Sequence, residues 1–129
     1  MNFEFLTIED ALEIHAMQLA RYGGGKGIRD RGLLESALAQ PQMTFDGEYV
    51  HEGIFAMAAA YLFHIVSNHP FLDGNKRAGL LCALVFLDLN GITTVRNSES
   101  LYDLTMTLAA GRAGKSEVAA ALERIASLH

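Results

Sequence analysis

Apolar positions along most of the chain recur at intervals of three and four residues, the spacing of a helix with one buried face. The first such segment begins at Thr7, whose pairing with Asp10 is typical of a capping box, and stops at Tyr22 because three glycines follow. Asp30 is placed to cap a second helix, which ends before Pro41. The pattern therefore predicts two helices in the first third of the chain.

Two segments in the middle of the chain are apolar on nearly every side, which predicts helices surrounded by other helices. The first covers residues 52–68 and the second 74–90, with Gly91 as its C-terminal stop and a short loop over 69–73 between them. Ahead of them, residues 42–51 carry aromatic and β-branched side chains around an Asp-Gly pair. This stretch is predicted to be a loop or a short hairpin-like flap.

Two further amphipathic helices are predicted in the C-terminal part of the chain. Ser98 is placed to cap the first, which ends at Gly111, and Ser116 to cap the second. No repeat, low-complexity tract or linker divides the sequence. We therefore predict a single all-α domain over residues 1–129, a bundle of about six helices with a short flap before the central pair.

Composition and charge narrow the classes of function. Half of the chain is apolar and 19% is charged, which indicates a packed core. The formal net charge of −5 offers no basic surface, so direct nucleic-acid binding is not expected. The single Cys82 excludes an internal disulfide and fits a reducing cytoplasm. The longest near-apolar run, 54–66, is too short to cross a bilayer, so we expect a cytoplasmic protein without membrane attachment.

Residues 69–77, His-Pro-Phe-Leu-Asp-Gly-Asn-Lys-Arg, gather several chemically active groups at the start of the second central helix. If the helix opens at Gly74, the free amides of its first turn and its dipole attract anions. Lys76 and Arg77 oppose the dipole and are unfavourable there unless an anion binds. With Asn75 beside them, these side chains predict a polyphosphate ligand.

The loop before this helix adds an acid and a base. Asp73 can hold a Mg²⁺ ion that bridges phosphate oxygens. His69 can take a proton from an attacking hydroxyl near neutral pH. Pro70 and Phe71 are interpreted as structural residues that set the path of the loop and anchor it in the core. Each residue alone also fits an ordinary cap or surface position, so the hypothesis depends on their occurring together.

Residues 69–77 resemble the signature of the Fic/Doc family, His-x-Phe-x-Asp/Glu-Gly-Asn-x-Arg, and a Lys before the final Arg marks its Doc branch. The resemblance extends over most of the chain, to residues 21–24, 27–30, 86–91 and 103–105. It implies the helical Fic/Doc fold and an enzyme that uses ATP and Mg²⁺.

The resemblance also implies a role for each residue of the signature. His69 would be the general base that activates the acceptor hydroxyl, and Asp73 would ligate the metal ion. Gly74 and Asn75 would hold phosphate oxygens, and Arg77 would supply charge to the transferring group. Such positioning and charge stabilisation is most of what phosphoryl transfer requires of a protein.

Lys76 bears on which group is transferred. Fic enzymes generally transfer AMP and usually carry Gly at this position, whereas Doc-like proteins resemble kinases. A lysine would fill part of the pocket and present the γ-phosphate, so transfer of phosphate to a protein hydroxyl is the preferred interpretation. Gly74 matches the Fic pattern, and AMP transfer therefore stays open. A binding protein that kept the fold but lost catalysis is a second alternative.

The resemblance implies two partners. Doc-like toxins act on a protein, with elongation factor Tu as the family's type of target, and a small antitoxin restrains them. Residues 44–48 match the self-inhibitory motif of Fic proteins only by chance, so restraint by a separate antitoxin is expected, through a disordered segment that folds into an apolar groove. The flap at 45–50 is a candidate docking strand for the target and equally an ordinary surface loop.

Several other features carry no clear chemistry. The glycine-rich stretch 23–27 lacks a P-loop ending and is interpreted as a flexible connection between helices. His64 lies in an apolar segment and is interpreted as a hydrogen-bonded core residue. Cys82 is predicted to be a small buried side chain, and His15 gives no signal.

Overall fold

The computed structural model describes residues 2–94 and 99–127 of the chain. Its elements are α1 (Ile8–Tyr22), α2 (Arg31–Ala39), a short 3₁₀ helix η1 (Gln40–Gln42), β1 (Thr44–Phe45), β2 (Glu48–Tyr49), α3 (Ile54–Asn68), α4 (Asn75–Leu89), α5 (Glu99–Ala109) and α6 (Lys115–Ser127). The described part therefore contains six α-helices and one two-stranded sheet. The predicted all-α bundle with a short flap is confirmed.

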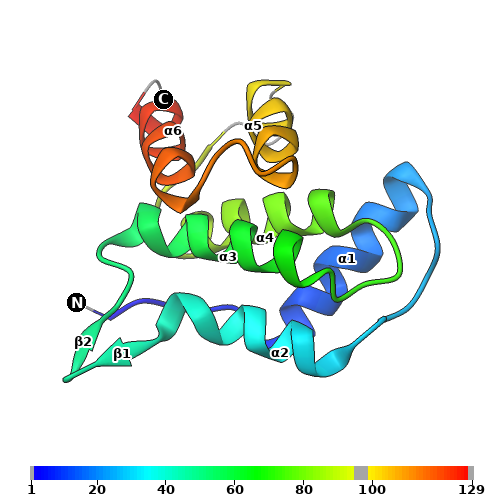
Figure 1. Cartoon of the computed structure of the whole chain (residues 1–129), viewed down its shortest axis with the longest axis horizontal. Coiled ribbons are helices and arrows are strands. Elements are labelled where there is room, and N and C mark those ends of the chain that lie inside the picture. The colour runs from blue at the N-terminus through cyan, green and yellow to red at the C-terminus, as the bar shows by residue number, and fades with distance from the viewer. Residues whose placement is uncertain (1, 95–98, 128–129) are drawn as a thin grey trace.

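The helices form three layers, with α3 and α4 in the middle (Figure 1). Helix α3 packs against α2 and α6, while α4 packs against α1 and α5. The prediction that these two helices are central is confirmed, since residues 57–62 of α3 and 78–84 of α4 are all buried. Cys82 lies in this core, as predicted, and burial raises the pKa of its thiol to about 12. No helix of the described residues is long and apolar enough to span a bilayer.

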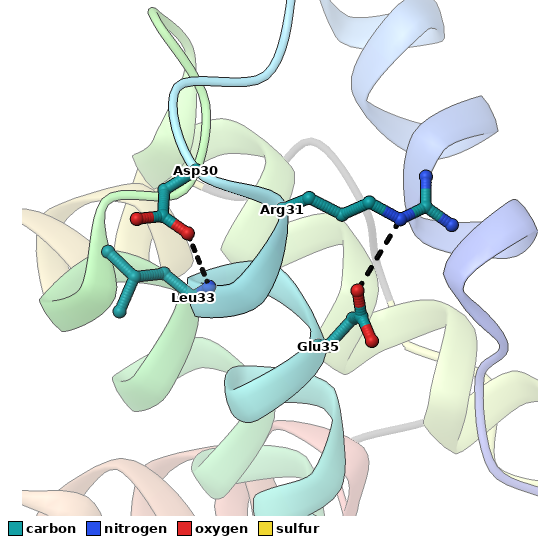
Figure 2. A network of polar contacts seen from close by, with 4 residues as sticks. All are labelled: Asp30, Arg31, Leu33 and Glu35. Carbon is teal, nitrogen blue, oxygen red and sulfur yellow. Dashed lines mark hydrogen bonds and ion pairs between the residues drawn. The ribbon is translucent and has the colours of Figure 1, made fainter.

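The helix caps that the sequence indicates near the N-terminus are present. The Thr7 hydroxyl accepts from the Asp10 N–H at 3.1 Å, and the Asp10 carboxylate accepts from the Thr7 N–H at 2.9 Å. Asp30 caps α2 by accepting from the Leu33 N–H at 3.0 Å (Figure 2). The ion pair that follows on α2, between residues 31 and 35, is exposed and contributes little to stability.

The predicted start of the last helix is wrong by two residues. Helix α6 begins at Lys115, and the Gly114 carbonyl accepts its first backbone hydrogen bond, from Val118 N at 3.2 Å. Ser116 is therefore inside the helix. The carboxylate of Glu117 accepts from the Gly114 N–H at 3.1 Å and satisfies a donor at this end. The predicted cap Ser98 lies outside the described residues.

Helix α3 begins two residues later than predicted, at Ile54, whereas α4 begins at Asn75 with Gly74 as its N-cap, where the sequence placed its opening. Each is preceded by a glycine with positive φ, Gly53 at 90° and Gly74 at 79°. Because this conformation is not helical, the glycine ends the preceding loop and the helix starts at the next residue.

The flap is a hairpin in which Thr44 pairs with Tyr49 and Phe45 with Glu48. The residues at its tip, Asp46 and Gly47, both have positive φ, as the favoured two-residue hairpin turn requires. The hairpin leads into the first turn of α3, whereas the loop at 69–74 follows its last turn (Figure 1). A helix of 15 residues separates them by about 22 Å. The flap thus lies at the opposite end of α3 from the signature loop.

Candidate active site

The loop between α3 and α4 starts with a residue in a left-handed conformation. His69 has φ 51° and ψ 55°, and its N–H donates to the Ile65 carbonyl at 3.1 Å, so it closes the C-terminus of α3. For a residue other than glycine this conformation costs about 1–2 kcal/mol. The His69 side chain is exposed. Contacts with the surrounding structure must therefore hold the His69 backbone in this conformation, which sets the direction of the imidazole.

Much of that support comes from residues 27–30, here called the brace, which run alongside the loop. Arg29 Nε donates to the His69 carbonyl at 2.6 Å, and its Nη2 donates to the Asn68 carbonyl at 2.9 Å. The amides of Arg29 and Asp30 both donate to the Pro70 carbonyl, at 2.7 and 3.0 Å. The last carbonyls of α3 and the start of the loop are thus held by an arginine that sequence reasoning did not select.

The far half of the loop is closed by Asn75. Its Oδ1 accepts from the Phe71 N–H at 2.9 Å, and its Nδ2 donates to the Phe71 carbonyl at 3.0 Å. Phe71 is fully buried, and Asn75 is only 4% exposed. The ring of His15 stacks on Phe71 with 3.8 Å between centroids. The Asn75 carboxamide is therefore engaged with the backbone of the loop and has one Nδ2 hydrogen left to donate.

Asp73 lies exposed just before α4, with both carboxylate oxygens oriented by backbone amides. Oδ2 accepts from the Gly25 N–H at 3.2 Å and Oδ1 from the Gly74 N–H at 2.8 Å. These hydrogen bonds, first that from Gly25, hold the pKa of the Asp73 carboxyl below its ordinary value. His15 Nε2 donates to the Asp73 carbonyl at 2.7 Å. Asp73 is therefore a preoriented carboxylate at neutral pH.

The glycine-rich stretch after α1 connects two helices, as predicted, but it also packs against Asp73. A Cβ atom at Gly24, whose φ is +124°, would lie 2.7 Å from Asp73 Oδ2. Only glycine allows this approach without displacing the carboxylate. The stretch is thus part of the site, which its composition did not indicate.

We expect Gly24→Ala to raise the pKa of Asp73 toward its ordinary value. The new methyl group would push the carboxylate away from the Gly25 N–H, the largest cause of the low pKa. NMR titration of the side-chain carboxyl measures the change. Gly25→Ala is the matched control, because its Cβ would lie 3.9 Å from that of Asp73, an ordinary contact, and its N–H remains. An equal rise in both variants would contradict the role given to Gly24.

The signature residues line one cavity of about 550 Å³ between the start of α4, the end of α1 and α5. Its lining includes His69, Asp73, Gly74, Asn75, Lys76 and Arg77. Every polar residue predicted for the site is therefore brought to a single cavity, of a size that suits a small-molecule ligand. Pro70 and Phe71 are buried and do not line it. No residue of the flap is among those lining it.

Comparison with known proteins agrees with this arrangement. The family model described as Fic/DOC family matches residues 5–87. The chain belongs to the Fic/Doc family. It is 36% identical over 120 residues to "Protein kinase doc" of Escherichia phage P1, covering 93% of this chain and 94% of that protein. It is also 38% identical over 89 residues to "Toxin Doc" of Mycolicibacterium smegmatis, covering 69% of this chain and 66% of that protein.

A metal ion in this Fic/Doc site would have one carboxylate from the protein. The described residues contain no group of three or more His, Cys, Asp or Glu side chains that could hold a metal. Asp73, ionised and exposed, fits the way Mg²⁺ is commonly bound, by one or two carboxylates together with substrate phosphates and water. The donor set therefore suits a magnesium ion that arrives with a nucleotide and does not suit a resident metal.

A second, larger cavity adjoins the Fic/Doc signature. This cavity, here called the groove, measures about 800 Å³ and lies between α1, α4 and α5. It is lined by Met17, Gln18, Arg21, Tyr22, Arg77, Leu80, Leu81, Leu84, Glu99, Tyr102 and Asp103. Arg77, Gln18 and the two tyrosines also line the signature cavity. The groove and the signature cavity therefore share a wall.

His64 lies outside both cavities and is hydrogen-bonded, as predicted, but only half-buried. The Lys115 ammonium lies 3.2 Å from Nε2 of His64 and of His51 and donates to both. Burial, followed by the charge of Lys115, lowers the pKa of His64 to about 4. Its place and its pKa both argue against a role as the general base.

We expect acid to destabilise the protein through His64. In the unfolded chain this side chain titrates at about 6.5, whereas in the folded protein it stays neutral to about pH 4. Between these values the unfolded state binds more protons, so the free energy of unfolding falls as the pH falls through this window. Urea unfolding at several pH values should show this loss in the wild type and a smaller one in His64→Gln. Identical slopes for the two proteins would contradict the assignment.

Proposed function

We propose that this Fic/Doc protein is a toxin that transfers the γ-phosphate of ATP to a hydroxyl group of a target protein. The observation that carries the proposal is the single cavity in which an exposed imidazole, a preoriented carboxylate and a helix start with two cations meet. Both relatives have names of the Doc type, and one is called a protein kinase. Elongation factor Tu is the proposed target.

In the proposed reaction the acceptor oxygen bonds to the γ-phosphorus as the bond from that phosphorus to the β-bridging oxygen breaks, and ADP leaves. His69 takes the proton of the acceptor hydroxyl. The first-turn amides of α4, with Lys76 and Arg77, hold the phosphate oxygens and stabilise the charge on the transferred group. Magnesium bound with the nucleotide would be held by Asp73 and would neutralise phosphate charge.

Lys76 supports phosphate transfer over AMP transfer. Its exposed side chain lines the cavity at the helix start, where glycine would leave more room for the α- and β-phosphates. The opposing feature, Gly74, has φ +79° as the residue before α4. A left-handed backbone favours glycine whichever group is transferred. Gly74 is therefore weak support for the AMP alternative.

Labelled ATP distinguishes the two reactions. We expect label from the γ-phosphate, and none from the α-phosphate, to reach purified elongation factor Tu. Intact-mass analysis should show a gain of about 80 Da for phosphate, against about 329 Da for AMP. A gain of the larger size would overturn the kinase assignment in favour of AMP transfer. If the same experiment in a cell extract labelled another protein and left elongation factor Tu unlabelled, only the proposed target would be overturned.

We further propose that the groove binds a segment of the cognate antitoxin. Its floor is apolar, with Leu80, Leu81 and Leu84, and its rim carries both cations and carboxylates, which suits an amphipathic helix that folds on binding. Because the groove shares Arg77 with the signature cavity, an occupant would lie beside the nucleotide. An antitoxin bound in the groove would inhibit the toxin directly, so the toxin would need no self-inhibitory motif of its own.

We expect Met17→Asp to weaken binding of the co-expressed antitoxin at least about tenfold, because a carboxylate would be buried against an apolar segment. Met17 is 53% exposed on the groove, so the substitution leaves the core intact. Calorimetry on the purified pair measures the change. Leu89→Asp is the matched control, an apolar residue 44% exposed that does not line the groove. Equal affinity of both variants would place the antitoxin elsewhere.

A further inference from the structure

The guanidinium of Arg77 lies against two tyrosine rings that come from different helices. Its Cζ is 3.7 Å from the ring centroid of Tyr22, the last residue of α1, and 4.6 Å from that of Tyr102 in α5. Both distances are within the range of a cation–π contact. We call Tyr22 and Tyr102 the tyrosine pair. One side chain of the signature thus ties together three helices.

The way Arg77 is held leaves its charge available. Among the residues that the structure describes, Arg77 forms no ion pair, so none of their carboxylates lies within 4.0 Å of its guanidinium nitrogens. A carboxylate would neutralise the guanidinium and occupy two of its donors. An aromatic ring attracts the cation through its face and leaves the in-plane N–H groups free. The tyrosine pair therefore restrains the side chain without using the donors that an anion needs.

We infer that the tyrosine pair positions Arg77 for phosphate. The two rings hold the guanidinium at the wall of the signature cavity, with its N–H donors free for the phosphate oxygens of the nucleotide. The inference rests on the proposed function, because it assigns Arg77 to the transferred phosphoryl group. It adds two positioning residues outside the signature: Tyr22 of α1 lies 47 positions before His69, and Tyr102 of α5 lies 25 positions after Arg77.

The contact itself can be tested without nucleotide. Protons that lie over an aromatic face are shifted upfield in NMR spectra, so the Hε resonance of Arg77 should be upfield of those of the exposed arginines. The shift should disappear in the double variant Tyr22→Leu/Tyr102→Leu. It should remain in Tyr22→Phe/Tyr102→Phe, which keeps both rings. Absence of the shift in the wild type, or its survival in the Leu variant, would overturn the inference.

The positioning role is tested by a double-mutant cycle on phosphate transfer. We expect the Leu double variant to lower kcat/KM at least about tenfold, mainly through kcat, and the Phe double variant to restore most of the loss. If the rings act through Arg77, the Leu substitutions should cost almost nothing further in an Arg77→Ala background. Additive losses would show that the rings act by another route and would overturn the inference.

Failure of the inference is distinguishable from failure of the proposed function. Wild-type protein that transfers phosphate but lacks the ring-current shift, or gives an additive cycle, would refute the tyrosine pair alone. Wild-type protein that shows the shift but neither binds ATP nor transfers phosphate would refute the proposed function and, with it, the phosphate role of the pair.

Discussion

Replacing His69 with asparagine will severely slow phosphate transfer while leaving ATP binding almost unchanged. Loss of a general base lowers the rate by about 10²–10⁴-fold. Asparagine adopts the left-handed conformation of His69 (φ 51°) more readily than alanine, so the loop should keep its shape. Single-turnover transfer of labelled γ-phosphate measures the rate, and calorimetry measures the affinity for ATP.

Growth arrest on expression separates this mechanism from the alternative of an inactive binding protein. A toxin that acts by catalysis should lose its effect in His69→Asn, whereas a protein that acts by binding alone should not. His64→Gln is the matched control, a histidine substitution outside the cavity, and it should still arrest growth. Arrest by soluble, folded His69→Asn protein would refute the catalytic assignment and favour the binding protein.

The features that the sequence predicted well are those decided by neighbouring residues. The caps at Thr7 and Asp30 depend on side chains within three positions of the amides they bind. The apolar patterns of α3 and α4 predicted their central position correctly, because a helix that is buried on all sides has no polar face. The signature residues are contiguous, so one loop and one helical turn bring them to a single cavity. Ser116 was misjudged because the short side chain that caps a helix is also tolerated inside it.

The parts that the sequence did not predict are contacts between distant segments. Arg29 holds the carbonyl of His69 across 40 positions, and His15 reaches the carbonyl of Asp73 across 58. Neither residue has a periodicity or spacing that indicates a partner so far along the chain. The glycines at 24 and 25 were visible, but their composition alone indicates flexibility. Only the fold reveals that Gly24 is small because Asp73 lies against it.

Asn75→Ala will lower both the stability of the protein and its affinity for ATP. The sequence assigned Asn75 to phosphate oxygens, whereas its carboxamide bonds to both backbone groups of Phe71. Removing the carboxamide leaves the buried N–H and carbonyl of Phe71 without this partner. The loss costs about 1–3 kcal/mol for each group. We therefore expect the free energy of unfolding, measured in urea, to fall by about 2–6 kcal/mol.

The stability measurement decides between the two roles of Asn75. A side chain that only binds phosphate would reduce affinity for ATP and leave urea unfolding unchanged. Asn68→Ala is the control, because it removes a single hydrogen bond, from Nδ2 to the Leu33 carbonyl at 3.0 Å, in a partly buried place. It should cost only about 1 kcal/mol. If Asn75→Ala were no more destabilising than this control, the loop would be held by the brace and by Phe71, and Asn75 would be a phosphate ligand.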